Sequence, residues 1–244
     1  MILPDFEENL SAEKLPELAR RLCSEEGFPV DGLMVLRKPQ KGGDCRMLFY
    51  NNDGSTAEMC GNGARCLCRF CHDHGLAGEN QALETPAGLV TGQRLDENSY
   101  RIRLNSATVL RHEEDLSYLE LGNPGIPHAV VEADLSRDRS ELREFARALR
   151  HSSRFPRGAN VNLYTLTGEN RLRLLTFERG VEDFTLACGT GTGATVMALT
   201  RLGKVTGKHT EVICEGGTLW VDIAENEIFL TGPAEELADK ELTL

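Results

Sequence analysis

The hydrophobic and polar positions along this chain follow two different periods, which indicates a mixed α/β protein. Between residues 11 and 23 apolar side chains recur on one helix face, at Leu15, Leu18, Ala19 and Leu22. Ser11 is the expected N-cap of this helix. Helices are also predicted over 64–74, 140–150 and 195–202. Short or alternating apolar runs between turn residues predict strands at 32–37, 45–50, 81–85, 88–93, 100–104, 129–133, 159–166, 171–178, 211–214, 218–223 and 227–230.

The order of these predicted elements recurs along the chain, which indicates an internal duplication. A chain of 244 residues is long enough for two domains of ordinary size. We therefore predict an N-terminal domain over 1–115 and a C-terminal domain over 116–244. The pattern leaves open whether the last strand returns to the first domain.

Charge and hydropathy exclude several kinds of partner. The formal net charge is −11, and lysine and arginine form no dense cluster of the kind that binds nucleic acid. No apolar run approaches the roughly 20 residues of a membrane helix, and the first residues lack the features of a signal peptide. We expect a cytoplasmic protein that binds neither nucleic acid nor membrane.

The eight cysteines are expected to be reduced thiols. Disulfide scaffolds belong to small secreted chains with a higher fraction of cysteine. The segment from Cys66 to His74 has some features of a metal site, because three cysteines and two histidines lie close together in it. A helix there would place Cys66 and Cys68 on different faces, and no second ligand pair stands at zinc-finger spacing. We therefore predict buried or inert thiols and no bound metal.

Two glycine-rich turns carry the clearest chemical signal. Cys60 opens the sequence Cys-Gly-Asn-Gly, and Cys188 opens the sequence Cys-Gly-Thr-Gly. Glycines after a thiol let the backbone approach a ligand closely, and a helix that begins there directs unpaired N–H groups at the sulfur. This placement favours a thiolate, so each cysteine is predicted to act as an acid or a base.

Other interpretations explain these turns less well. The glycine run 189–193 lacks the lysine of a phosphate-binding loop, and Ala194 breaks the spacing of a dinucleotide motif. A cysteine hydrolase could pair one thiol with His128, but the second turn would then have no role. An enzyme that inverts a carbon centre uses both thiols, because it removes a proton from one face and returns one to the other. Such an enzyme needs no pyridoxal phosphate, and we predict no cofactor.

At these turns the sequence resembles the two signatures of the diaminopimelate epimerase family. The resemblance lies in 51–66, 177–180 and 186–191, and it extends through 127–130 and 158–161 to Gly232-Pro233. It implies two α/β domains related by a pseudo-twofold axis, each a β-barrel-like sheet around a central helix, with the active site in the cleft between them. It also implies a homodimer and an isomerase that interconverts LL- and meso-diaminopimelate in lysine and cell-wall precursor biosynthesis.

The resemblance assigns roles to individual residues. Cys60 and Cys188 match the two acid/base cysteines, and His128 and Glu178 match positions that assist near the reacting centre. The substrate-binding groups of the family match Gly61, Asn62, Gly189, Thr190 and Glu178 near the reacting carboxylate and amine, and Asn51, Asn160 and Arg179 at the distal end. Taken singly, Asn51 is also explained as a turn residue, Arg179 as a surface ion pair and His128 as a core histidine.

Two departures from the family pattern bear on substrate and activity. Ile126 stands where the family often has an asparagine, so a racemase of another amino acid is an alternative, with Asn123 as a substitute contact. The chain opens with Met1-Ile2-Leu3, without the Gly-Asn-Asp segment of the family. We therefore expect a shortened protein of low activity, and a catalytically impaired amino-acid-binding protein is the second alternative.

Overall fold

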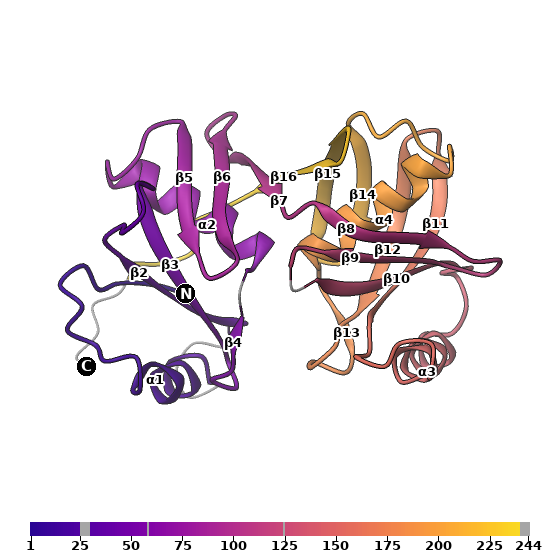
Figure 1. The fold of residues 1–244 in the computed structure, drawn as a ribbon, viewed down its shortest axis with the longest axis horizontal. Helices are drawn as coiled ribbons and strands as arrows, with labels where there is room; N and C mark the ends of the chain where they lie inside the picture. The colour runs from indigo at the N-terminus through magenta and orange to yellow at the C-terminus, as the bar shows by residue number, and fades with distance from the viewer. Residues whose placement is uncertain (25–29, 58, 124, 240–244) are drawn as a thin grey trace. The chain divides into compact units, whose positions relative to one another are not determined.

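The structure is a computed structural model that describes residues 1–24, 30–57, 59–123 and 125–239. The chain divides into two compact units (Figure 1). The first unit comprises Met1–Ile102 and Pro233–Leu244, and the second unit comprises Arg103–Gly232. The division therefore falls after Ile102, whereas the sequence pattern placed it between residues 115 and 116, and the first unit includes residues from the far end of the chain.

The first unit is built on a sheet with the strand order β1-β2-β3-β5-β6-β7, and β4 pairs with β3. Its strands are β1 (Ile2–Pro4), β2 (Gly32–Arg37), β3 (Cys45–Asn51), β4 (Thr56–Ala57), β5 (Asn80–Thr85), β6 (Gly88–Arg94) and β7 (Ser99–Leu104), which continues into the second unit. Its helices are α1 (Leu15–Leu22) and α2 (Gly61–Asp73). The β1–β2 and β3–β5 pairs are parallel, and the β2–β3, β5–β6 and β6–β7 pairs are antiparallel.

The second unit is built on a sheet with the strand order β16-β15-β14-β12-β11-β10-β9-β8, and β13 pairs with β12. Its strands are β8 (Ala107–His112), β9 (Ser117–Leu121), β10 (Ile126–Glu132), β11 (Asn160–Gly168), β12 (Arg171–Phe177), β13 (Phe184–Thr185), β14 (Thr210–Cys214), β15 (Gly217–Ala224) and β16 (Glu227–Pro233). Its helices are α3 (Arg139–Arg150) and α4 (Gly189–Arg201). The β10–β11 and β12–β14 pairs are parallel.

The two units repeat one order of elements and one pattern of strand pairing. Each unit contains a parallel strand pair with a helix between its strands, β1–α1–β2 or β10–α3–β11, and in the second unit the antiparallel pair β8–β9 precedes it. An antiparallel strand (β3 or β12), a two-residue strand (β4 or β13) and a long helix (α2 or α4) follow. The next strand, β5 or β14, then pairs in parallel with β3 or β12. The repeat extends to the register, because Met34 on β2 and Asn162 on β11 occupy equivalent places opposite Ile2 and Val130. These pairings confirm the recurrence that the sequence pattern indicated.

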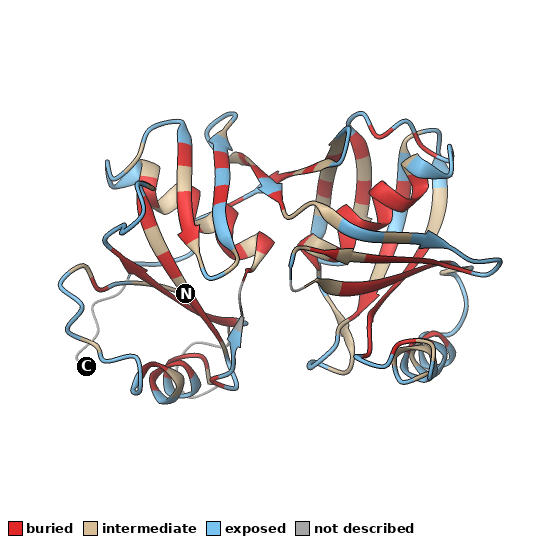
Figure 2. Ribbon diagram, viewed as in Figure 1, coloured by how far each residue is buried: buried red, intermediate tan, exposed pale blue. Residues whose placement is uncertain are grey.

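Each unit buries one long helix more deeply than its other helix (Figure 2). α4 is buried on most sides and contacts β9, β10, β11 and β15, so the sheet of the second unit curves around it. α2 contacts β5 and β6. The amphipathic α1 packs its predicted apolar face against β2 and β3, and α3 packs against β11 and β12. Closure of either sheet into a barrel stays a prediction.

Several element ends differ from the sequence-based expectation. Ser11 is not the N-cap of α1, which begins at Leu15 after Lys14 and has proline in its first turn, where a missing N–H costs nothing. The helices expected from 64 and 195 begin earlier, at Gly61 and Gly189. The chain's first residues form β1, and four further strands were not predicted: the two-residue strands β4 and β13, the largely exposed β8, and the buried β9. None of the described helices is long and apolar enough to cross a membrane.

Candidate active site

Cys60 is the N-cap of α2 in the first unit. Its backbone is extended, with φ −129° and ψ 113°, and its Sγ accepts a hydrogen bond from the N–H of Gly63 at 3.3 Å. The side chain is half-buried. A helix N-terminus carries partial positive charge and unpaired N–H donors, and both stabilise a negatively charged sulfur. This turn can therefore stabilise a thiolate.

Cys188 is the N-cap of α4 in the second unit and has nearly the same local geometry. Its φ is −112° and its ψ is 110°, and the N–H of Gly191 donates to its Sγ at 3.4 Å. The Oγ1 of Thr190 lies 3.5 Å from the same sulfur. The glycine-rich sequence after each cysteine is thus the first turn of the helix itself, which explains why both helices begin earlier than their apolar pattern predicts.

Burial raises the pKa of the Cys188 thiol well above its ordinary range. The negative charge of Glu178 raises this pKa as well, whereas hydrogen bonds with Thr190 and Gly191 lower it. The side chain is 7% exposed, so the loss of hydration outweighs the effect of the helix N-terminus. In this turn the expected preference for a thiolate is therefore overcome, and Cys188 is a neutral thiol that is able to donate a proton.

Glu178 and Arg179 follow β12 directly, and hydrogen bonds fix both. The Oγ1 of Thr185 donates to Oε1 of Glu178 at 2.5 Å. The backbone N–H of Arg179 donates to Oδ1 of Asn160 at 2.8 Å, and its exposed guanidinium donates to the carbonyl oxygen of Arg157 at 3.2 Å. An exposed guanidinium held at one nitrogen can still bind a carboxylate through its other donors.

His128 lies in β10 and is fully buried. Burial, with a smaller contribution from the charge of Arg179, lowers its pKa to about 3, so the imidazole is neutral at physiological pH. Its Nδ1 lies 3.3 Å from Nδ2 of Asn162, which can only donate, so Nδ1 is the acceptor and Nε2 carries the proton. Among the described residues Nε2 has no hydrogen-bond partner.

Two further polar side chains lie beneath the first turn of α4 and were not among the predicted site residues. Asn162 is fully buried, and Thr176 is buried and donates from its Oγ1 to Oδ1 of Asn162 at 3.0 Å. The sequence does hold a signal for both, since each is a polar residue inside an otherwise apolar strand segment, at 161–163 and 174–177. Buried polar groups in such places need hydrogen-bond partners.

The remaining predicted residues of the first unit are held by local hydrogen bonds. Gly61 is the buried first residue of α2, and Oδ1 of Asn62 accepts a hydrogen bond from Arg65 at 3.1 Å. Asn51 ends β3, and its Nδ2 donates to Oγ of Ser55 at 2.9 Å. Cys60, Gly61 and Asn62 therefore share one turn, while Asn51 lies at a strand end.

The predicted residues of the second unit are gathered around the start of α4. His128 and Asn160 are partners in the parallel ladder of β10 and β11. Asn160 holds the backbone of Arg179, and the carboxylate of Glu178 acts on the Cys188 thiol. Gly189 and Thr190 belong to the first turn of the helix. This unit thus combines a cysteine, a carboxylate, a neutral imidazole and helix N–H donors.

Three other cysteines of the first unit, Cys45, Cys68 and Cys71, form a separate buried group. The sulfurs of Cys45 and Cys71 lie 3.0 Å apart, and both side chains are buried with Cys68. Burial raises the pKa of Cys68 to about 12, while the hydrogen bond with Cys45, followed by burial, raises the pKa of Cys71. All eight cysteines are free, and within the described ranges no group of histidine, cysteine and carboxylate side chains could hold a metal ion.

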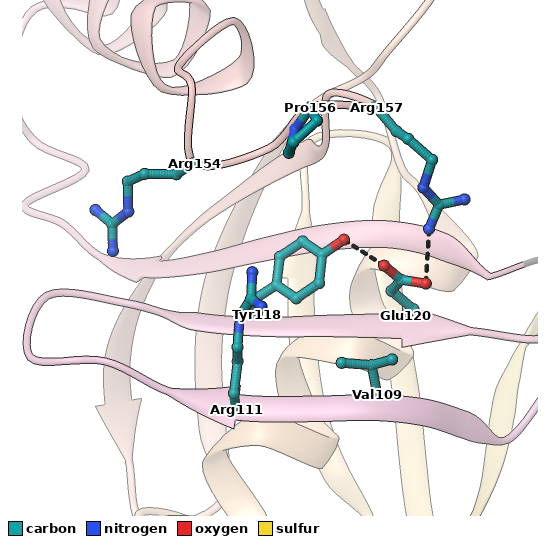
Figure 3. A pocket seen from close by; sticks show the side chains of 7 residues that line it. All are labelled: Val109, Arg111, Tyr118, Glu120, Arg154, Pro156 and Arg157. Carbon is teal, nitrogen blue, oxygen red and sulfur yellow. Dashed lines mark hydrogen bonds and ion pairs between the residues drawn. The ribbon is translucent and has the colours of Figure 1, made fainter.

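A pocket of about 300 Å³ lies on the second unit over β8 and β9 (Figure 3). It is lined by Val109, Arg111, Tyr118, Glu120, Arg154, Pro156 and Arg157. Each arginine is matched by a carboxylate, since Arg157 pairs with Glu120 at 2.7 Å, Arg154 with Asp115 and Glu113, and Arg111 with Glu113. Tyr118 donates to Glu120 at 2.5 Å. The pocket has no surplus charge with which to attract an anion.

The fold is one that solved amino-acid racemases share with phenazine biosynthesis proteins of the PhzF family. The structure aligns with the crystal structure of a probable proline racemase from Agrobacterium radiobacter K84 with a TM-score of 0.69. The alignment covers 99% of this chain and 87% of that chain at 18% sequence identity, so it shows the shared fold.

Sequence comparison gives the family. The diaminopimelate epimerase family profile matches residues 1–109 and 121–237. A diaminopimelate epimerase of Archaeoglobus fulgidus is 33% identical over 250 residues, which cover 95% of this chain and 88% of that protein. One from Methanothrix thermoacetophila is 36% identical over 252 residues, which cover 93% and 87%. The chain belongs to the diaminopimelate epimerase family and is an isomerase, as the two signatures implied.

Proposed function

We propose that this chain interconverts LL- and meso-diaminopimelate without a cofactor, by proton transfer through Cys60 and Cys188. The observation that carries the proposal is the pair of cysteine N-caps, each hydrogen-bonded by the third residue of its own helix. Family membership supports the substrate, because both relatives named above are diaminopimelate epimerases. The proposal requires that the two units present these sulfurs to opposite faces of one α-carbon.

The protonation of Cys188 suggests how a turnover begins. In one direction the thiolate of Cys60 takes the α-proton and becomes a thiol, and the carbanion takes a proton from the Cys188 thiol, which becomes a thiolate. Burial and the charge of Glu178 hold the proton on Cys188 before the reaction. The same factors make the product thiolate of Cys188 a strong base, so the reverse direction follows with the roles exchanged.

The carbanion formed beside the carboxylate needs stabilisation, which the helix N-termini supply. The first N–H groups of a helix have no carbonyl oxygen of the same helix to which they can donate. On α2 these include the N–H groups of Gly61 and Asn62, and on α4 those of Gly189 and Thr190. We propose that they bind the α-carboxylate as negative charge spreads onto it. This stabilisation removes the need for an electron-withdrawing cofactor.

The remaining residues are proposed to bind and orient the substrate. Asn51, Asn160 and Arg179 would hold the distal amino-acid end, with the exposed guanidinium of Arg179 on its carboxylate. Glu178 would act through the protonation of Cys188. His128 is fully buried and neutral, so we assign it an orienting role in place of proton transfer.

We further propose that the reaction serves lysine and cell-wall precursor biosynthesis in the cytoplasm, and that the protein works as a homodimer. The pathway follows from the substrate of the relatives. Chemical cross-linking and size-exclusion chromatography with light scattering would test the dimer, and a monomer at micromolar concentration with full activity would contradict it.

Incubation with LL-diaminopimelate in deuterated water tests the reaction. We expect solvent deuterium at one α-carbon together with appearance of the meso form. The Cys60→Ala/Cys188→Ala double variant is the control for uncatalysed exchange. The racemase alternative, which Ile126 suggests, predicts label in another amino acid, such as proline, and none in diaminopimelate. Absence of label in every amino acid tested would favour the amino-acid-binding alternative.

A further inference from the structure

The two cysteine turns lie over different side chains at the third residue of each helix. A Cβ added to Gly63 of α2 would lie 2.9 Å from Sδ of Met34. A Cβ added to Gly191 of α4 would lie 2.3 Å from Oδ1 of Asn162 and 3.1 Å from Oγ1 of Thr176. Met34 and Asn162 occupy equivalent places on β2 and β11, so the two units differ at this position, with a thioether in the first and an amide in the second.

The amide of Asn162 is held on every side. Its Nδ2 lies 3.1 Å from the carbonyl oxygen of Ala129, 3.4 Å from that of Asn160 and 3.3 Å from Nδ1 of His128. Its Oδ1 accepts the hydroxyl of Thr176 at 3.0 Å. The two carbonyl contacts fix which end of the amide is the donor. Oδ1 therefore faces the first turn of α4, where it lies against Gly191.

This arrangement connects the amide to the reacting sulfur through one residue. Gly191, which packs on Oδ1 of Asn162, is the residue whose N–H donates to Sγ of Cys188 at 3.4 Å. The close approach leaves no room for displacement of the helix toward β11. The rigidly held Oδ1 beneath the turn therefore fixes the distance between the Gly191 N–H and Sγ of Cys188. This hydrogen bond lowers the pKa of Cys188 and so partly counteracts the increase caused by burial.

We propose that Asn162 is a positioning residue for Cys188, which holds the first turn of α4 through Gly191 and holds His128 in the tautomer with its proton on Nε2. This inference rests on the proposed function for its meaning in catalysis, because Asn162 acts only through residues of the proposed site. A leucine keeps the bulk beneath Gly191 but loses the hydrogen bonds that hold the amide, so the side chain can move, the turn can shift and the hydrogen bond from Gly191 to the sulfur weakens. The negative charge of Glu178 raises the pKa of Cys188, and the hydrogen bond from Gly191 would then no longer counteract it.

The test replaces the amide with an apolar group of similar shape in Asn162→Leu, and Met34→Leu is the matched control at the equivalent place of the first unit. The rate of alkylation by iodoacetamide is measured against pH, separately for Cys188 and Cys60 by peptide mass spectrometry. We expect Asn162→Leu to slow the alkylation of Cys188 about tenfold near neutral pH and to move its profile to higher pH, because one pKa unit changes the thiolate fraction about tenfold. Cys60 serves as the internal reference, and its rate should stay unchanged.

Kinetics separate positioning from substrate contact. Because Asn162 is fully buried and bonded to protein groups, we expect it to act without contacting substrate, so kcat for diaminopimelate should fall on the order of tenfold to a hundredfold while KM changes little. Met34→Leu should leave the alkylation of Cys188 unchanged, since it exchanges one apolar side chain for another in the other unit. The nitrogen chemical shifts of His128 in labelled protein should show the Nε2–H tautomer in the wild type and a mixture in Asn162→Leu.

Two results would overturn the inference. One is a folded Asn162→Leu variant in which the Cys188 profile is the same as in the wild type, and the other is an equal change at Cys188 and Cys60, which would indicate general destabilisation. If Asn162→Leu does not fold, Thr176→Val decides, because it keeps the side-chain shape and removes only the hydroxyl donor; it should give a smaller shift of the same sign at Cys188. The alkylation assay needs no substrate, so it remains decisive even if the wild type fails to epimerise diaminopimelate, a result that would reject the proposed function alone.

Discussion

The turns at Cys60 and Cys188 have the same backbone and different surroundings. Both cysteines are extended N-caps whose sulfur accepts an N–H from the third residue of the helix, and their φ and ψ angles agree closely. Beneath the first turn of α2 lies the thioether of Met34, whereas beneath that of α4 lie the buried polar groups of Asn162 and Thr176. Duplication has thus preserved the backbone that presents a thiol and changed the side chains that support it.

This difference shows how one fold can give two thiols separate properties. A helix N-terminus favours a thiolate in either turn, so the backbone alone makes the two sulfurs alike. In the second unit burial and the charge of Glu178 oppose that effect and keep Cys188 protonated. In the proposed mechanism one thiol begins as the acid and the other as the base, and the protonated Cys188 would be the acid.

The sharpest test of the comparison removes each sulfur in turn. Cys60→Ala and Cys188→Ala should each lower kcat/KM for diaminopimelate by about a thousandfold or more, because general acid–base catalysis is lost on one face of the α-carbon. Cys66→Ala is the matched control, since it removes a half-buried thiol from α2 outside the N-cap. Near wild-type turnover in either N-cap variant, with a native circular dichroism spectrum, would reject the use of two cysteines.

Acid should destabilise the second unit in particular, because a histidine is buried beneath its turn. The pKa of His128 is about 3 in the folded chain against an ordinary value of 6.5, so between these values the unfolded chain binds a proton that the folded chain does not. The free energy of unfolding should therefore fall as the pH is lowered from about 6.5 toward 3, by about 1.4 kcal/mol per pH unit for this one proton.

Urea unfolding at several pH values would measure this slope. The fluorescence of Trp220, the single tryptophan, reports on β15 of the second unit. His128→Asn keeps an acceptor in place of Nδ1 and cannot become charged, so it should flatten the slope. An equally steep slope in the variant would assign the acid sensitivity to the carboxylates instead.

Replacing the third residue of each helix with alanine should lower the free energy of unfolding by different amounts in the two units. Gly191→Ala places a Cβ against the fixed amide of Asn162 and should destabilise the protein by about 1–3 kcal/mol. Gly63→Ala meets Sδ of Met34, a flexible side chain that can move aside, and should cost less than about 1 kcal/mol. Urea midpoints of the two variants give the comparison, and equal losses would show that the amide is no more rigid than the thioether.

The smallest expected effect concerns the charge beside Cys188. Glu178→Gln removes a carboxylate that raises the pKa of this thiol, so the alkylation profile of Cys188 should move to lower pH, by up to about one pH unit. The profile of Cys60 in the same sample is the control. A shift to higher pH would mean that Glu178 stabilises the thiolate, opposite to its role in the structure.

The sequence predicted the parts of the fold that have a strong period, and it predicted both cysteine turns. The apolar face of α1 lies where expected, because burial on one side imposes the helical spacing. β2 also lies where expected, because all of its residues are buried and most of them form a short apolar run. β8 was missed because most of its residues are exposed, and the two-residue strands β4 and β13 are too short to have a period. The glycine turns hid the first turn of α2 and α4, since glycine has low helix propensity.

The support beneath each turn could not be predicted from the sequence. Asn162 and Thr176 lie 14 residues apart on two different strands, and each is only an isolated polar residue in an apolar strand. They become a pair through the register of β11 and β12, which places Asn162 opposite Thr176. The raised pKa of Cys188 likewise depends on burial and on the position of Glu178, and neither follows from the Cys-Gly-Thr-Gly motif.

The return of the chain to the first unit after Gly232 sets an order for folding during synthesis. The second unit is one continuous segment, whereas the first unit includes Pro233 and Ala234, whose carbonyl oxygens accept hydrogen bonds from Arg65 and Arg69. A ribosome therefore completes the second unit before it releases the residues that finish the first. Until that segment emerges, α2 lacks these two carbonyl acceptors, although Arg65 can already bind Asn62 and Arg69 can already bind Asp73. The helix that presents Cys60 therefore completes its contacts only after the second unit has been made.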